Sequence, residues 1–286
     1  MIAVVTDSTA YLPTGWADSW GIEVVPVQVV IDGVGYDETD ADQAAAVTAA
    51  LLAMRAVTTS RPSPERFSQA IGAAADAGAD GVVIATLSAA MSSTYESALL
   101  AARDAMIDVR VVDSGTIAMG LGFGVLAGAR SARDGADITT VADVIAHVSA
   151  ASDVTFVVDS LEYLRRGGRI GAARAAVGQA LQVKPILAVR EGTVVEIDRV
   201  RTLARAMDHL RDRAVRRVTE GMHDTSGSSG AAIAVQYIGH ADRAEHLAAA
   251  LGVALPDVRI VVCPVGGVVG AHVGPGMVAT VVSPAG

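Results

Sequence analysis

The first half of the chain alternates short runs of β-branched residues with longer segments of helical spacing, and this alternation constrains the fold most strongly. Val82–Thr86 has the length and composition of a buried strand, and Met91–Ala105, soon after it, has those of a helix. Strands that alternate with helices favour a mostly parallel α/β sheet, because each crossover helix returns the chain to the start of the next strand. The predicted strands are Ile2–Thr6, Ile22–Val30, Val82–Thr86 and Val109–Asp113, and the predicted helices are Asp40–Met54, Pro64–Ala77, Met91–Ala105, Ile117–Arg133 and Thr139–Ala150.

The second half has a different pattern. Pro185–Val189 and Val194–Ile197 flank Glu191-Gly192, which predicts a hairpin, and a long amphipathic helix follows from residue 203. Hairpins and long helices favour an α+β domain. We therefore expect an α/β domain over residues 1–151 and an α+β domain over residues 152–286. The glycine-rich stretch from Ile260 to Gly286 is expected to form a strand, a loop and a strand.

Composition removes several classes of function. The chain of 286 residues has a net charge of −9 and only 3% aromatic residues, so neither a basic field nor stacking platforms for nucleic acid are expected. The sole lysine, Lys184, precedes Pro185, which excludes a Walker A loop. The single cysteine, Cys263, lies in an apolar run and is predicted to be a buried structural thiol. With no basic leader at the start of the chain, these features fit a cytoplasmic protein.

The usual enzyme motifs are missing from the sequence. No Gly-x-Ser-x-Gly elbow is present, and the six histidines show no metal-binding spacing, so neither a metal nor a cofactor is expected. Gly120, Gly122 and Gly124 resemble part of a dinucleotide loop, but Val125 stands where that loop needs a small residue. Close helix packing explains these glycines better.

Three hydroxyl-rich turns follow or join apolar segments: Thr6–Thr9, Thr58–Ser63 and Ser88–Tyr95. Ser and Thr often cap helices, which is the simplest interpretation of any one turn. The carboxyl ends of parallel strands form a common ligand crevice, so three such turns favour a shared anion site. A fourth segment, Gly266–Gly276, carries His272 among glycines that allow close approach of the backbone.

Together these segments resemble the DegV family, bacterial fatty-acid-binding proteins that include the FakB subunits of fatty acid kinase. The resemblance covers essentially the whole chain. It rests on the order and spacing of six motifs: Val4–Pro13, Thr58–Pro62, Ser88–Tyr95, Leu161–Ile170, Lys184–Leu187 and the His272 loop.

The resemblance implies two domains with a long-chain fatty acid between them, and a carrier that presents the acid to a kinase without catalysing a reaction itself. It assigns the carboxylate to Thr59 and Ser92, with Ser60, Ser93, Thr94 and His272 nearby. Two residues depart from the family pattern: Arg61 stands where Gln is usual, and Ser93 where Gly is usual.

Arg165, Arg166, Arg169 and Arg174 form a basic cluster in an acidic chain. A solvated turn with carboxylate partners is one interpretation. Docking to a kinase subunit, or transient contact with an anionic membrane surface, is the other. Two further functions stay open at this point: an acyl hydrolase or acyltransferase that uses Ser92 or Ser93 with His272, and a lipid-sensing regulatory protein.

Overall fold

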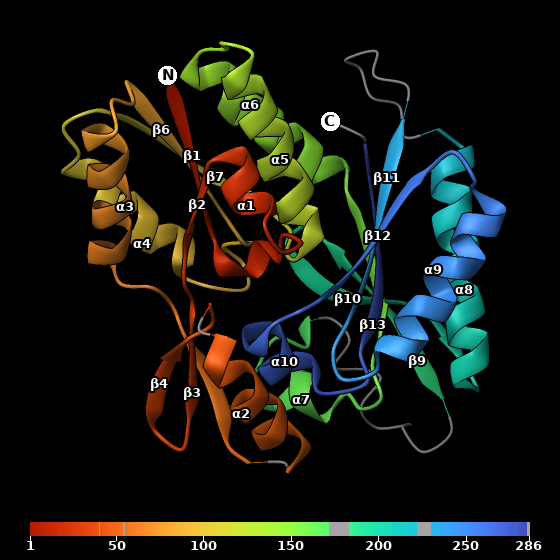
Figure 1. The fold of residues 1–286 in the computed structure, drawn as a ribbon. Helices are drawn as coiled ribbons and strands as arrows, with labels where there is room; N and C mark the ends of the chain where they lie inside the picture. The colour runs from red at the N-terminus through yellow and green to blue at the C-terminus, as the bar shows by residue number, and fades with distance from the viewer. Residues whose placement is uncertain (40, 54, 172–182, 222–229, 285–286) are drawn as a thin grey trace.

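The computed structural model describes residues 1–39, 41–53, 55–171, 183–221 and 230–284, and within these ranges the chain forms three sheets (Figure 1). The N-terminal sheet is parallel, with strand order β2-β1-β6-β7. Its strands are β1 (Ile2–Asp7), β2 (Ile22–Val25), β6 (Gly81–Thr86) and β7 (Asp108–Asp113). This confirms the predicted parallel α/β arrangement.

Helices cover both faces of the N-terminal sheet because its strands are apolar on both sides. Val4 and Val83 pack against α5 (Met119–Arg133) and α6 (Ile138–Ala151). The next residue along each strand, such as Val5 or Ile84, points to the opposite face and packs against α3 (Pro64–Asp76) and α4 (Thr94–Arg103). The alternation follows from the two-residue period of a strand.

Helices α5 and α6 touch closely, and the α5 glycines are what permits it. A Cβ on Gly124 would lie 2.2 Å from Ser149 Oγ, and one on Gly128 would lie 2.3 Å from a side-chain carbon of Ile145. The prediction of close helix packing is therefore confirmed for Gly124, whereas Gly120 lies against Thr116 and Val154, and Gly122 against Ala10.

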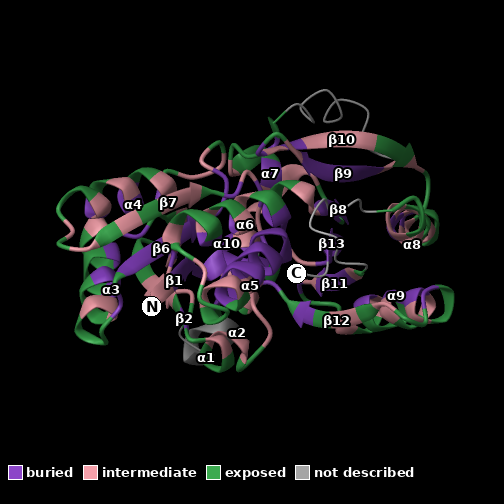
Figure 2. Cartoon of the chain, turned by 90° about the horizontal axis from the view of Figure 1, so that it is seen from above, coloured by how far each residue is buried: buried purple, intermediate pink, exposed green. Residues whose placement is uncertain are grey.

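The C-terminal sheet is mixed, with strand order β10-β9-β8-β13-β11-β12. Its strands are β8 (Asp153–Val157), β9 (Lys184–Arg190), β10 (Thr193–Val200), β11 (Ala231–Tyr237), β12 (Arg259–Pro264) and β13 (Val278–Pro284). The predicted hairpin at Glu191-Gly192 is confirmed as the turn between β9 and β10. Helices α8 (Leu203–Thr219) and α9 (Ala241–Ala254) cover one face of the sheet, while the other faces α5, as Figure 2 shows.

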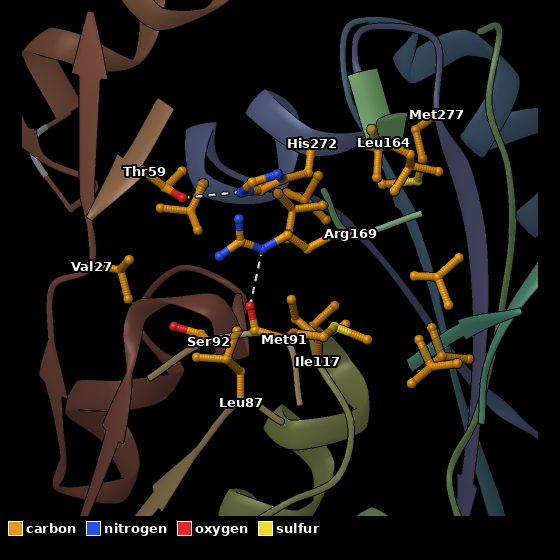
Figure 3. Close-up of a pocket in the computed structure, with 18 of the residues that line it drawn as sticks. Val27, Thr59, Leu87, Met91, Ser92, Ile117, Leu164, Arg169, His272 and Met277 are labelled. Atoms are coloured by element: carbon orange, nitrogen blue, oxygen red, sulfur yellow. Dashed lines mark hydrogen bonds between the residues drawn. The ribbon is translucent and has the colours of Figure 1, made fainter. Parts of the chain in front are cut away.

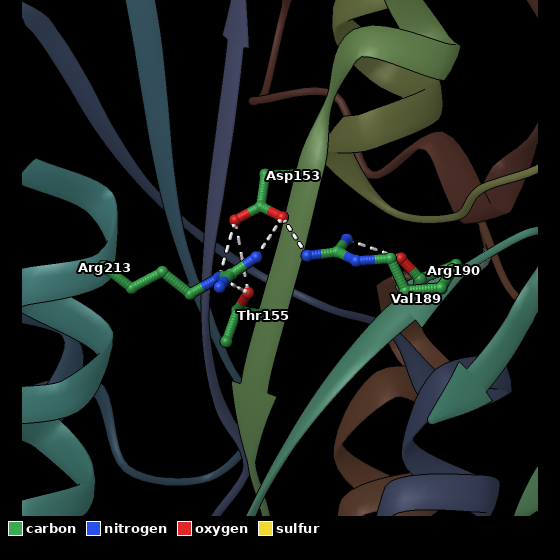
Figure 4. Close-up of polar contacts among 5 residues, drawn as sticks. All are labelled: Asp153, Thr155, Val189, Arg190 and Arg213. Atoms are coloured by element: carbon green, nitrogen blue, oxygen red, sulfur yellow. Dashed lines mark hydrogen bonds and ion pairs between the residues drawn. The ribbon is translucent and has the colours of Figure 1, made fainter. Parts of the chain in front are cut away.

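One buried carboxylate holds α8 to this sheet (Figure 4). Asp153, at the start of β8, accepts two hydrogen bonds of 2.9 Å from the Arg213 guanidinium and pairs with Arg190 of β9. Burial by itself would raise the pKa of Asp153, but the hydrogen bonds and charges of the two arginines outweigh it and lower the pKa. The carboxylate therefore stays ionised and paired.

A third, small antiparallel sheet was not predicted. It has the order β4-β3-β5 and comprises β3 (Gln28–Ile31), β4 (Val34–Asp37) and β5 (Val57–Ser60), with α2 (Ala41–Leu52) beside it. The predicted strand Ile22–Val30 is in fact split at Pro26, which has no N–H for a ladder, so its two halves belong to different sheets. The first three residues of the predicted turn Thr58–Ser63 also belong to a strand, because β5 extends to Ser60.

The stretch from Gly266 to Gly276 also differs from the prediction, because it contains helix α10 (Gly267–Val273) instead of a loop. Helix α10 lies between α2 and α7 (Glu162–Arg166), in the middle of the molecule (Figures 1 and 2). The small sheet thus packs on elements from the C-terminal half.

The strands of the N-terminal sheet all precede residue 151, and those of the C-terminal sheet all follow residue 152. We propose to place the domain boundary between these two residues. Over the described ranges, no helix is both long and apolar enough to cross a bilayer.

Candidate ligand-binding pocket

A cavity of about 260 Å³ lies where the N-terminal sheet, the C-terminal sheet and α10 meet. The loops that follow β6 and β7 contribute Leu87 and Ile117, and the inner face of the C-terminal sheet contributes Phe156 and Val189. Most of the wall is aliphatic. The polar side chains in the wall are Thr59, Ser60, Arg61, Ser92, Ser93, Arg169, Gln236 and His272.

Thr59 and His272 meet at one end of this cavity, although 213 residues separate them in the chain. A hydrogen bond of 3.0 Å joins Thr59 Oγ1 on β5 to His272 Nε2 on α10. Burial, and then the nearby charge of Arg169, lowers the pKa of His272 to about 4. The imidazole is therefore neutral at physiological pH, and its other nitrogen, Nδ1, is buried with no hydrogen-bond partner among the described residues.

Ser92 lies at the same end of the cavity, on the other side of the Arg169 guanidinium from this pair (Figure 3). It belongs to the loop between β6 and α4, and its Oγ lies 2.9 Å from Thr94 Oγ1. Thr94 is fully buried behind Ser92 and does not line the cavity. Ser60 and Ser93 line the cavity and are exposed, so of the predicted binding residues only Thr94 is displaced from the wall.

Arg169 lies on the pocket, whereas the sequence had grouped it with a docking surface. Figure 3 shows its guanidinium between the Thr59–His272 pair and Ser92. Arg169 Nε donates to the carbonyl of Met91 at 3.1 Å, and Nη1 donates to the carbonyl of Gly167 at 2.8 Å. The hydroxyl groups of the site therefore share it with a cation.

The other arginines of this turn face away from the pocket. Arg165 and Arg166 are exposed, and both pair with Glu162 one turn earlier in α7. Those hydrogen bonds lower the pKa of Glu162 to about 2. Arg174 lies outside the described residues.

The first hydroxyl-rich turn does not join the other two, so the prediction of one shared site for all three was wrong. The Asp7 carboxylate bonds to the protein backbone, because it accepts hydrogen bonds from the N–H groups of Thr9 at 2.9 Å and Leu87 at 2.7 Å. Asp7 and Ser8 line a second cavity of about 560 Å³.

Two further residues of that second cavity, Tyr11 and Glu38, had no recognisable sequence signal. Both accept hydrogen bonds from backbone N–H groups at the start of α10, and a contact across so many residues leaves no pattern in the local sequence. Cys263, also on this cavity, is buried as predicted, and burial raises the pKa of its thiol to about 11.

Comparison with known proteins identifies the family of this chain. The sequence model of the DegV family, described as uncharacterised proteins, matches residues 1–285. The chain belongs to the DegV family. A DegV domain-containing protein of Streptomyces coelicolor is 42% identical over 283 residues, covering 99% of this chain and 98% of that protein.

Two solved DegV structures share the fold over almost their full length. A DegV family protein from Thermus thermophilus, described with its fatty acid binding, has a TM-score of 0.88 and 29% identity, with 99% of each chain covered. DegV of Bacillus subtilis, described as a fatty acid binding protein, has a TM-score of 0.87 and 27% identity, with 99% of this chain and 98% of that chain covered.

Proposed function

We propose that this DegV protein binds a long-chain fatty acid in the 260 Å³ cavity, with the carboxylate at Thr59, Ser92 and His272. The observation that carries the proposal is the distribution of polar groups, since a cluster of hydroxyls, an imidazole and the Arg169 guanidinium occupies one end of an otherwise largely aliphatic cavity. That distribution suits a molecule with one small anionic head and a long apolar tail. The fatty acid binding described for the Thermus and Bacillus relatives supports the same ligand class.

The tail is expected to supply most of the affinity. Burying about 15 methylenes at roughly 0.8 kcal/mol each gives on the order of 12 kcal/mol before the costs of ordering the chain. A hydrogen bond to a charged group adds about 1.5–3 kcal/mol. The polar residues therefore orient the acid more than they hold it.

We further propose that the protein presents the carboxylate to a kinase and does not itself catalyse a reaction. The contacts of His272 support this. Its Nε2 is bonded to Thr59, and over the described ranges its Nδ1 has no carboxylate or carbonyl partner of the kind that orients the histidine of a serine triad. Ser92 is bonded to Thr94 and His272 to Thr59, so within the described part of the chain no hydrogen bond joins Ser92 to His272 as the nucleophile–base pair of a hydrolase would require.

The test compares two substitutions on neighbouring positions of β5. Thr59→Val removes the head-group hydroxyl. Thr58→Val makes the same change on the exposed face of the strand, away from the cavity, and serves as the control. Displacement of a fluorescent fatty acid by palmitic acid measures Kd for both, and for Ser92→Ala.

The proposal predicts about 5- to 150-fold weaker binding for Thr59→Val and Ser92→Ala, the equivalent of losing about 1–3 kcal/mol. Thr58→Val should bind as the unmodified protein does. Unchanged affinity in both pocket variants would mean that the carboxylate lies elsewhere, and acyl-ester turnover abolished by Ser92→Ala would favour the hydrolase.

A further inference from the structure

Glu38 is a half-buried residue directly after β4 whose carboxylate is enclosed by three hydrogen-bond donors. Tyr11 Oη and the backbone N–H of Val268 each donate to Oε1 at 2.7 Å, and Ser8 Oγ donates to Oε2 at 2.5 Å. Tyr11 Oη in turn accepts from the N–H of Val269 at 3.1 Å. One carboxylate therefore joins three segments of the chain, of which Val268 is 230 residues away.

These contacts do for α10 what a capping side chain does for other helices. The N-cap residue is Gly266, which has no side chain to accept from the first N–H groups of the helix. Glu38 and Tyr11 accept from two of these groups instead. The Glu38 carboxylate occupies the space that a side chain at the N-cap would need, since a Cβ on Gly266 would lie 2.4 Å from Glu38 Oε1.

Helix α10 is also the wall of the fatty-acid pocket. Val268, Val269, His272 and Val273 all line the cavity. The helix is only seven residues long, so a shift at its start is carried within one turn to His272. Helix α10 therefore connects the residues that Glu38 and Tyr11 hold to the bond between His272 and Thr59.

The negative charge of Glu38 lowers the stability of the fold. No cation pairs with Glu38 among the described residues, and burial raises its pKa to about 7. A raised pKa means that ionising the group destabilises the fold as pH rises from about 4.5 through 7. A neutral glutamine would accept from Val268 and Tyr11 in the same way without that penalty, so the ionised form points to a role other than folding.

We infer that Glu38 is a positioning residue for the head-group end of the pocket, and that its ionised form makes fatty-acid affinity rise with pH. The inference rests on the proposed function. Charge-assisted hydrogen bonds are shorter and about twice as strong as neutral ones, so the ionised carboxylate fixes α10 more firmly than the protonated acid does. Protonation loosens the helix start, and with it His272.

Other titratable groups surround Glu38. Asp7 faces it from the end of β1, with a pKa that burial also raises. Tyr11 bonds to it, and Asp37 precedes it on β4, where Asp37 pairs with Arg66. From α10 only backbone N–H groups reach it. Because burial raises the pKa of Asp7 as well, substitution of Glu38 is needed to isolate its contribution.

The experiment measures Kd for palmitic acid from pH 6 to pH 8.5 in the unmodified protein, in Glu38→Gln and in Glu23→Gln. Glu23 is an exposed glutamate on β2, so its substitution is the matched control. Compared with the unmodified protein, Glu38→Gln should bind palmitic acid about tenfold more weakly at pH 8.5. The two should bind equally well at pH 6, where Glu38 of the unmodified protein is protonated. Glu23→Gln should follow the unmodified protein throughout.

Calorimetry in buffers of different ionisation enthalpy gives a second readout. Since ligand binding and Glu38 ionisation favour each other, binding near pH 7 should release protons, and Glu38→Gln should abolish that release. Folding is checked by Tm, which at pH 8.5 should be at least as high in Glu38→Gln as in the unmodified protein. Tyr11→Phe, which removes one donor to the carboxylate, should move the midpoint of the affinity profile to higher pH.

Equal affinities of Glu38→Gln and the unmodified protein at every pH, or unchanged proton release, would overturn the inference while leaving fatty-acid binding intact. Failure of the unmodified protein to bind palmitic acid at any pH would remove both this inference and the proposed function.

Discussion

Gly167 gives the sharpest test of how the pocket is built. Its backbone has φ −72° and ψ −8°, an ordinary helical conformation that alanine adopts without strain. The obstacle to a side chain is His272, because a Cβ on Gly167 would lie 2.1 Å from Nδ1 and 3.0 Å from Cε1 of the imidazole. Gly167→Ala must therefore push His272 away from Thr59.

The size of the effect follows from these contacts. Overpacking a filled site costs about 1–3 kcal/mol of folding free energy. Displacing His272 also loses its hydrogen bond to Thr59, about 1 kcal/mol, and disorders the head-group end. We expect palmitic acid to bind to Gly167→Ala about 5- to 30-fold more weakly, which corresponds to about 1–2 kcal/mol.

The neighbouring glycine is the control. Gly168 has φ +69° and nothing within 4 Å of its Cβ position. Gly168→Ala should cost about 1–2 kcal/mol of stability through backbone strain and leave the affinity unchanged. Tm and Kd measured on both variants separate the two effects.

A double-mutant cycle completes the test. In a His272→Ala background the clash is gone, so Gly167→Ala should have no cost and gain up to about 1 kcal/mol of stability from the less flexible unfolded chain. The same loss of stability in both backgrounds would refute the argument that His272 packs against Gly167.

Three other substitutions test the remaining features. Asp153→Ala should lower the free energy of unfolding by about 3–5 kcal/mol, because two arginines lose their buried partner, whereas Asp212→Ala, at an exposed pair, should cost less than about 1 kcal/mol in the same denaturant titration. Reversing Arg165 and Arg166 together to Glu should spare Tm and Kd but weaken a salt-sensitive transfer of the acid to the kinase; full kinase-coupled turnover at low salt would remove the docking role. The free energy of unfolding should fall as pH drops from 6.5 towards 4, because His272 takes up a proton in the unfolded chain before it does so in the folded protein. His272→Gln should flatten that part of the Tm–pH profile. An unaltered slope would contradict the low pKa of His272.

Elements with a local sequence signal were predicted well. The run Val82–Thr86 became β6 (Gly81–Thr86), and Glu191-Gly192 became the β9–β10 turn, because periodicity and turn chemistry are properties of neighbouring residues. Helix α10 has no such signal. Its glycines suggest a loop, yet they are required by close packing: a Cβ on Gly270 would lie 2.4 Å from Ile238.

The candidate site shows the same division. The resemblance to the DegV family assigned the carboxylate to Thr59 and Ser92 with His272 nearby, and the fold brings all three to one cavity. The direction of a side chain is not encoded locally, so the sequence did not reveal that Arg169 lines the pocket. Glu38 was missed because its partners, Tyr11 and the start of α10, come from other parts of the chain.

Native mass spectrometry of freshly purified protein tests the central claim most directly. If the aliphatic cavity holds a fatty acid, the intact protein should carry one acid per chain, released on denaturation, with a mass typical of a long-chain acid. Thr59→Val should show lower occupancy than Thr58→Val prepared in parallel. A chain mass without ligand in every preparation, together with no rise in Tm when palmitic acid is added, would contradict the claim.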